Sequence, residues 1–158
     1  MRSGLILLLV VLGLAVAACG GGGGGGNPSA AEFRRQADAV CAKYEGKINA
    51  LGTPNSLDEL GDFVDQVVPI VEEGNSELKK IEPPDEFSED WDRVLAIQDE
   101  NLQTTRDLQD AIHNGDAAKV QELVSKLDAA QAESTQIAGK LGLEKCGQSG
   151  AAGTTTGQ

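Results

Sequence analysis

Residues 56–81 read SLDELGDFVDQVVPIVEEGNSELKKI and contain two helix breakers, Pro69 and Gly74. This segment decides the fold, because the number of helices in the protein depends on whether these breakers divide it. Either breaker could divide the segment into two short helices. A capping pair, Ser56 and Glu59, predicts where the helix begins. The apolar side chains stay in helical register through both breakers, which favours one helix kinked near Pro69: Leu57, Leu60, Val64, Val67, Val71, Leu78 and Ile81.

The segment before this one also has a helical pattern. Ser29 and Glu32 form a second capping box, and the breaker cluster at residues 52–55 ends the helix. The apolar residues between these signals recur at spacings of three and four, as one face of a helix requires: Phe33, Ala37, Val40, Tyr44, Ile48 and Leu51.

Two further helices follow the stiff proline connection at residues 82–85. The third is predicted from Phe87 to His113, where Asn114-Gly115 stops it, and the fourth begins after Asp116 as its N-cap. Their inward faces carry Phe87, Trp91, Val94, Leu95, Leu102, Leu108 and Ile112, then Val120, Leu123, Val124, Leu127, Ile137 and Leu141.

Four amphipathic helices with short connections predict an all-α protein. The expected architecture is an antiparallel up-down-up-down four-helix bundle over residues 29–147. The small, polar residues 148–158 lack the apolar content of a folded segment, so they are predicted to form a disordered tail.

The first 18 residues have the pattern of a secretory signal peptide. Arg2 precedes an apolar run from Leu5, and small residues end the segment at Ala18. The run is shorter than the roughly 20 apolar residues that a transmembrane helix needs. Residues 1–18 are therefore predicted to be removed on export.

The residues around the expected cleavage point, Val16-Ala17-Ala18-Cys19, resemble the lipobox of bacterial lipoproteins. The resemblance implies that a diacylglycerol is attached to the Cys19 sulfur and that cleavage makes Cys19 the new N-terminus. Residues 19–28, rich in glycine, are then a flexible tether of about 17 Å root-mean-square length. An ordinary cleaved signal with an unrelated cysteine is the alternative.

Lipidation of Cys19 leaves Cys41 and Cys146, which can pair in an oxidising compartment. Two free buried thiols are the alternative. The fourth helix should end near the start of the first, some distance from Cys41. Pairing therefore requires that residues 142–146 turn back along the first helix, or that the first helix extends beyond the bundle.

A second resemblance rests on ADAVC at residues 37–41 and GLEKCG at residues 142–147. Both are similar to short motifs in small exported helical lipoproteins of high-GC Gram-positive, actinobacterial type. That group is uncharacterised, so the likeness implies the fold and the cysteine pairing but no activity.

Charge and residue types narrow the possible functions. The chain has 25 Asp and Glu against 13 Lys and Arg, a formal net charge of −12, which predicts repulsion of nucleic acid. The single histidine, His113, follows Asp110 at metal-ligand spacing, but a di-iron bundle needs two such pairs. The acids between Glu82 and Asp92 suit a helix N-terminus without a bound cation. We predict no metal, no cofactor and no catalytic residues.

Several polar side chains lie close to the apolar stripes of the third and fourth helices: Gln98, Asn101, Thr105, Gln131 and Ser134. They could line a polar pocket or lie at the edge of the stripe, and the second interpretation is favoured.

These patterns favour a non-enzymatic binding or interaction module, held by lipid on the outer face of the cell membrane. Its partner would be an envelope protein or a small molecule. A cation- or solute-binding lipoprotein is the first alternative. An enzyme or an accessory subunit is the second, and it has the least support because no nucleophile has a base partner.

Overall fold

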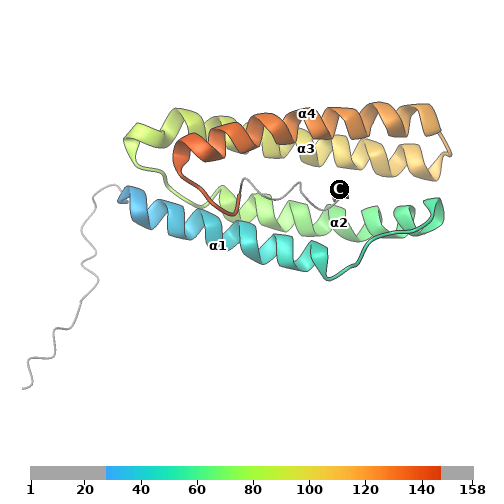
Figure 1. Ribbon diagram of the computed structural model, residues 1–158, viewed down its shortest axis with the longest axis horizontal. Coiled ribbons are helices and arrows are strands. Elements are labelled where there is room, and N and C mark those ends of the chain that lie inside the picture. Colours follow the sequence, from blue (N-terminus) through green and yellow to red (C-terminus); the bar gives the residue numbers. More distant parts are fainter. Residues whose placement is uncertain (1–27, 147–158) are drawn as a thin grey trace, which may run out of the picture.

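The computed structural model describes residues 28–146, and that part of the chain is helical with no strand. The elements are α1 (Ala30–Asn49), α2 (Leu57–Leu78), the 3-10 helix η1 (Asp85–Phe87), α3 (Ser88–His113) and α4 (Ala117–Leu141). The long helices, α1 to α4, run in antiparallel order (Figure 1), which confirms the predicted up-down-up-down bundle. The predicted signal peptide, Cys19, its tether and the C-terminal tail lie outside the described residues.

Three of the helices begin where their capping residues predict. The Ser29 hydroxyl accepts a hydrogen bond from the Glu32 N–H at 3.2 Å, and Ser56 accepts from Glu59 at the same distance. The Asp116 carboxylate accepts from the N–H of the third residue of α4 at 3.0 Å. Each cap satisfies an amide that has no partner inside its own helix, which locates the helix start.

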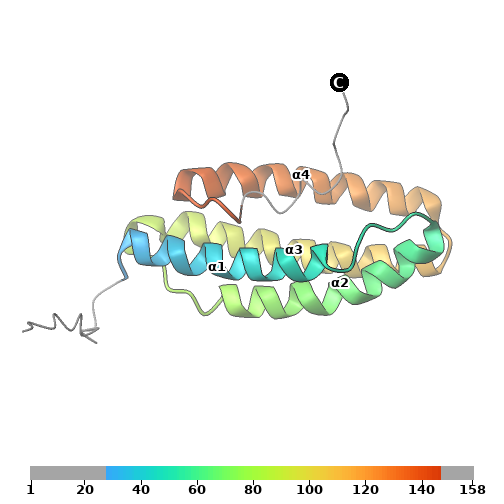
Figure 2. The same ribbon diagram turned by 60° about the horizontal axis from the view of Figure 1, so that its bottom comes forward.

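Helix α2 runs without a break through Pro69, as the continuous apolar register predicts. Figure 2 shows that it bends between its two halves. The proline ring crowds the preceding turn and provides no N–H, so the helix bends there but does not end. Residues 57–78 therefore form one helix of the bundle and not two.

The core is built from two apolar clusters at different levels of the bundle. In the larger cluster the ring of Phe33 meets Trp91 edge to face, with centroids 5.0 Å apart. The indole N–H of Trp91 donates to the Ile81 carbonyl at 3.3 Å, so its burial leaves no unpaired donor. The smaller cluster joins α3 to α4 through Leu108, Ala111 and Leu123.

Helices that are consecutive in the chain pack closely, whereas α1 and α4 make no comparable backbone contact. Helix α1 is the shortest of the four and ends before the far end of the bundle (Figure 1). The connection that follows it runs on to reach the start of α2. Helices α1 and α4 meet at one end, where Arg34 Nε donates to the Leu141 carbonyl at 2.6 Å, and they make few backbone contacts along the rest of this side.

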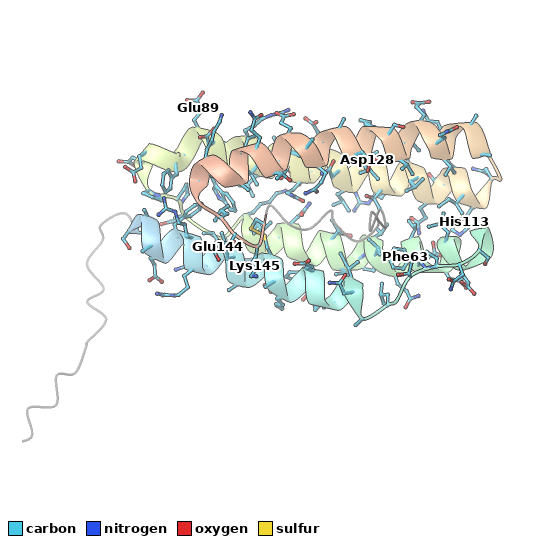
Figure 3. The ribbon with its side chains drawn as sticks, in the orientation of Figure 1. Phe63, Glu89, His113, Asp128, Glu144 and Lys145 are labelled. Carbon is cyan, nitrogen blue, oxygen red and sulfur yellow. A yellow bond between two sulfur atoms is a disulfide. The ribbon has the colours of Figure 1, made fainter. Side chains whose placement is uncertain are left out.

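The residues after α4 cover this side by turning back along α1. The Asp38 carboxylate accepts hydrogen bonds from the backbone N–H groups of Glu144 at 3.1 Å and Lys145 at 2.7 Å. Figure 3 shows both residues against α1, beside the disulfide. Cys41 and Cys146 are bonded, with their Cα atoms 5.1 Å apart. The predicted pair is confirmed, and of the two geometries the return along α1 is the one observed.

One predicted core position is wrong. Val124 is 43% exposed, although its spacing places it near the apolar stripe of α4. Neighbouring Leu123 is buried against α3 in the smaller cluster. Because α4 packs mainly on α3, a narrow stripe is enough to cover its contact face and Val124 falls outside it.

Gly74 sets how closely α1 approaches α2. A Cβ atom at this position would lie 3.0 Å from Cγ of Tyr44, whereas Gly46 in α1 has open space around it. We expect Gly74→Ala to cost about 1–3 kcal/mol through overpacking, partly offset by better helix propensity. The control Gly46→Ala should stabilise by about 0.5–1 kcal/mol. Urea unfolding measures both, and equal effects would contradict the close contact.

The disulfide closes a loop with a sequence separation of 105 residues. Removing the disulfide increases the conformational entropy of the unfolded chain. For a loop of this length, the chain-entropy model gives a loss of about 4.7 kcal/mol in the free energy of unfolding. We expect reduction, or the double variant Cys41→Ser with Cys146→Ser, to lower the urea midpoint strongly. The double variant should show no further loss in reductant. An unchanged midpoint in the reduced protein would overturn this account.

Candidate binding cavity

A cavity of about 270 Å³ lies on the side of the bundle where α1 and α4 make few backbone contacts, partly open to solvent. We call it the seam cavity. All four helices and the end of the described chain contribute to it, so it forms only when the bundle is closed. It is lined by Val40, Cys41, Tyr44, Glu45, Ile48, Asn49, Val71, Gly74, Asn75, Leu78, Gln98, Asn101, Thr105, Gln131 and Cys146.

The two walls of the seam cavity differ in polarity. Helices α3 and α4 contribute only polar side chains, those of Gln98, Asn101, Thr105 and Gln131. The three on α3 are spaced so that they share one helix face. Helices α1 and α2 supply the aliphatic side chains and the Tyr44 ring, with the disulfide beside them, together with the polar residues Glu45, Asn49 and Asn75. The cavity is therefore amphipathic.

Much of the hydrogen-bonding capacity of the polar wall is unused. The side chains of Gln98 and Asn101 make no hydrogen bond to another residue within 28–146. Asn75 is 4% exposed, and its amide nitrogen donates to the Gln98 backbone carbonyl at 2.9 Å. This bond fixes the orientation of the Asn75 carboxamide, whose oxygen has no partner among the described residues. Such groups are available to a ligand or to water.

Charged side chains bridge α1 and α2 over Tyr44. Lys43 contacts Glu77 at 2.8 Å and Lys47 contacts Glu73 at 2.6 Å. The two ammonium groups lie 4.8 and 4.5 Å from the centroid of the tyrosine ring. Both lysines are thus held by carboxylates and the ring. Neither of them lines the seam cavity.

The protonation equilibria follow from this arrangement. The hydrogen bond from Lys47 holds the pKa of Glu73 below its usual value, and the bond from Lys43 does the same for the pKa of Glu77. Burial raises the pKa of the Tyr44 hydroxyl, which has no hydrogen-bond partner within the described range. Among the described lining residues, Glu45 is the one that carries a formal charge.

The structure changes the interpretation of the polar side chains beside the apolar stripes of α3 and α4: Gln98, Asn101, Thr105, Gln131 and Ser134. Four of the five residues, all except Ser134, line the seam cavity, so the favoured position at the edge of a stripe is wrong for them. Ser134 is buried and lies outside the lining.

Asn75 was missed by the sequence reasoning. It shares a face of α2 with Val71 and Leu78, and all three line the seam cavity. A carboxamide on an otherwise apolar helix face was the signal that could have identified it, because such a group needs a partner when buried.

The other residues considered for chemistry lie elsewhere. His113 ends α3, with its Nε2 atom 3.6 Å from Oδ1 of Asp65 on α2. The acidic stretch at residues 82–92 spans the proline connection, η1 and the first turn of α3. Within residues 28–146, no group of three or more His, Cys, Asp or Glu side chains is arranged to hold a metal ion.

A second cavity of about 740 Å³ lies between the start of α2 and the α3–α4 turn. Glycine, alanine and aliphatic residues form most of its lining, with Asp62, His113 and Gln121 as the polar members. It lacks a buried carboxamide held in a fixed orientation, which Asn75 provides in the seam cavity. The seam cavity is therefore the stronger candidate site.

No protein-family model, curated protein or solved structure matches this chain. Across residues 28–146, none of the helices combines the length and apolar character needed to cross a bilayer.

Proposed function

We propose that this protein is a lipid-anchored, non-enzymatic binding module of the cell envelope that holds a small ligand in the seam cavity. The observation that carries the proposal is the polar wall, where the side chains of Gln98 and Asn101 line the cavity and form no hydrogen bond to another residue within 28–146. Lipid on Cys19 would keep the domain at the outer face of the membrane, with the glycine-rich segment as its tether.

The lining supports binding more than catalysis. Carboxamide and hydroxyl groups donate and accept hydrogen bonds but do not take up or release protons near neutral pH. The cavity is partly open, so water can reach these groups. A ligand that binds there can replace this water and take over its hydrogen bonds.

The mouth of the seam cavity is held in place on its α1 side. Cys41 and Cys146 both line the cavity, and the disulfide joins α1 to the segment that follows α4. A covalently held rim reduces the ordering cost of binding, since the cavity exists before the ligand arrives. This favours a small solute over a large protein surface as the occupant.

The anchoring part of the proposal is tested at Cys19. We expect Cys19→Ala to abolish labelling by a radioactive fatty acid and to release the protein from the membrane fraction, because two acyl chains supply the binding energy. Cys41→Ala is the matched control and should remain membrane-bound and labelled. Retention of the Cys19 variant in the membrane would contradict lipid anchoring at this residue.

The binding part is tested by filling the cavity. Gln131→Trp places a bulky ring in the seam cavity, whereas Gln136→Trp adds the same ring to an exposed position of α4. We expect the purified full chain and the Gln136 variant to retain a small molecule from envelope extracts, detected by mass spectrometry. The Gln131 variant should lose it while keeping its helical circular dichroism spectrum. Equal retention by both variants would overturn the proposal.

A further inference from the structure

We propose that the ligand of the seam cavity is a neutral polyol of the size of one sugar ring, and this inference rests on the proposed function. The same chemistry is offered by a free sugar and by the terminal unit of an envelope glycan. Three properties of the cavity support the assignment: its charge, its two unlike walls and its volume.

The charge of the lining disfavours anions. Glu45 is the charged residue of the described lining, and Lys43 and Lys47 are paired with glutamates outside it. A phosphate or carboxylate ligand would find no cation in the cavity and would be repelled by the acidic chain. A neutral ligand avoids this cost, and the Glu45 carboxylate can accept a hydroxyl hydrogen from it.

The two walls match the two sides of a sugar ring. A pyranose has an equatorial rim of hydroxyl groups and flatter faces formed by C–H groups. Gln98 and Asn101 line the cavity from α3, and Val71, Leu78 and the Tyr44 ring line it from α1 and α2. A sugar between these walls would hydrogen-bond on one side and bury its C–H surface on the other.

Carboxamides suit vicinal hydroxyl groups in particular. Each offers two N–H donors and one acceptor oxygen in a plane, so it can donate to one hydroxyl and accept from its neighbour. Asn75 is already oriented by its bond to the Gln98 carbonyl, which leaves its oxygen as a fixed acceptor. Fixed groups lose less freedom on binding than mobile ones.

The volume is consistent with a single ring. About 270 Å³ corresponds to about nine water molecules at the volume each occupies in the liquid. A single hexose ring is of a size that this space can hold. Because the cavity is partly open, a glycosidic bond could continue from the ring into solvent.

The test uses the purified full chain and a panel of named probes. Glucose, galactose, mannose, N-acetylglucosamine and myo-inositol represent polyols. Glutamate, inorganic phosphate, lysine and adenine represent other classes. We expect at least one polyol to shift the side-chain amide signals of Gln98 and Asn101 in nuclear magnetic resonance spectra. The methyl glycoside and a disaccharide ending in the same sugar then distinguish a free sugar from a glycan terminus.

Variants of the polar wall separate binding from folding. Asn101→Leu and Gln98→Met keep the side-chain size but remove the hydrogen-bonding groups, and each should weaken polyol binding about tenfold. Neither should lower the melting temperature, because neither side chain bonds to a described residue. Gln103→Met, on the exposed face of α3, is the control and should bind as the parent protein does.

The outcomes distinguish this inference from the proposed function. If a charged or aromatic probe binds in the seam cavity and no polyol does, the polyol assignment is wrong and the binding function stands. If polyols bind equally well to the parent and to Asn101→Leu, they bind elsewhere and the assignment is wrong. If neither probes nor envelope extracts yield a ligand that Gln131→Trp excludes, both proposals fail.

Discussion

The disulfide between Cys41 and Cys146 helps to close the side of the bundle on which α1 and α4 make few backbone contacts. Four helices in sequence make three close pairs, and a short returning segment supplements the fourth pair here. The Asp38 carboxylate receives backbone N–H groups from this segment, and the disulfide fixes its end. Covalent closure allows α1 and α4 to stay apart without losing the bundle.

Separation of these helices has a direct consequence for the core. The two apolar clusters occupy different levels, and the wall of the seam cavity on α3 lies between Ile97 of the larger cluster and Leu108 of the smaller one. The clusters provide the packing that holds the fold, so the level between them can carry polar groups. A small acidic domain can in this way combine a stable scaffold with a cavity whose hydrogen-bonding groups remain unpaired.

The patterns that predicted the fold correctly are local or periodic. Ser29, Ser56 and Asp116 mark helix starts because a side-chain oxygen next to the first turn satisfies an unpaired amide. The continuous register around Pro69 predicted one helix because the period of the apolar face survives a bend. The prediction that Val124 faces the core was wrong. The width of an apolar stripe depends on how many helices pack against it, and the sequence of a single helix does not encode that number.

The sequence by itself determined the number and extent of the helices, their antiparallel order and the cysteines able to pair, since these follow from periodicity, caps, short connections and cysteine number. It also carries the lipobox resemblance at Cys19. Only the tertiary structure decided that Gln98, Asn101 and Gln131 face a cavity together with Asn75. The same helix positions would lie at a solvated edge if α1 packed on α4. Which surface a polar residue faces depends on the distance between helices, and that distance is set here by the Gly74–Tyr44 contact, the disulfide and the returning chain.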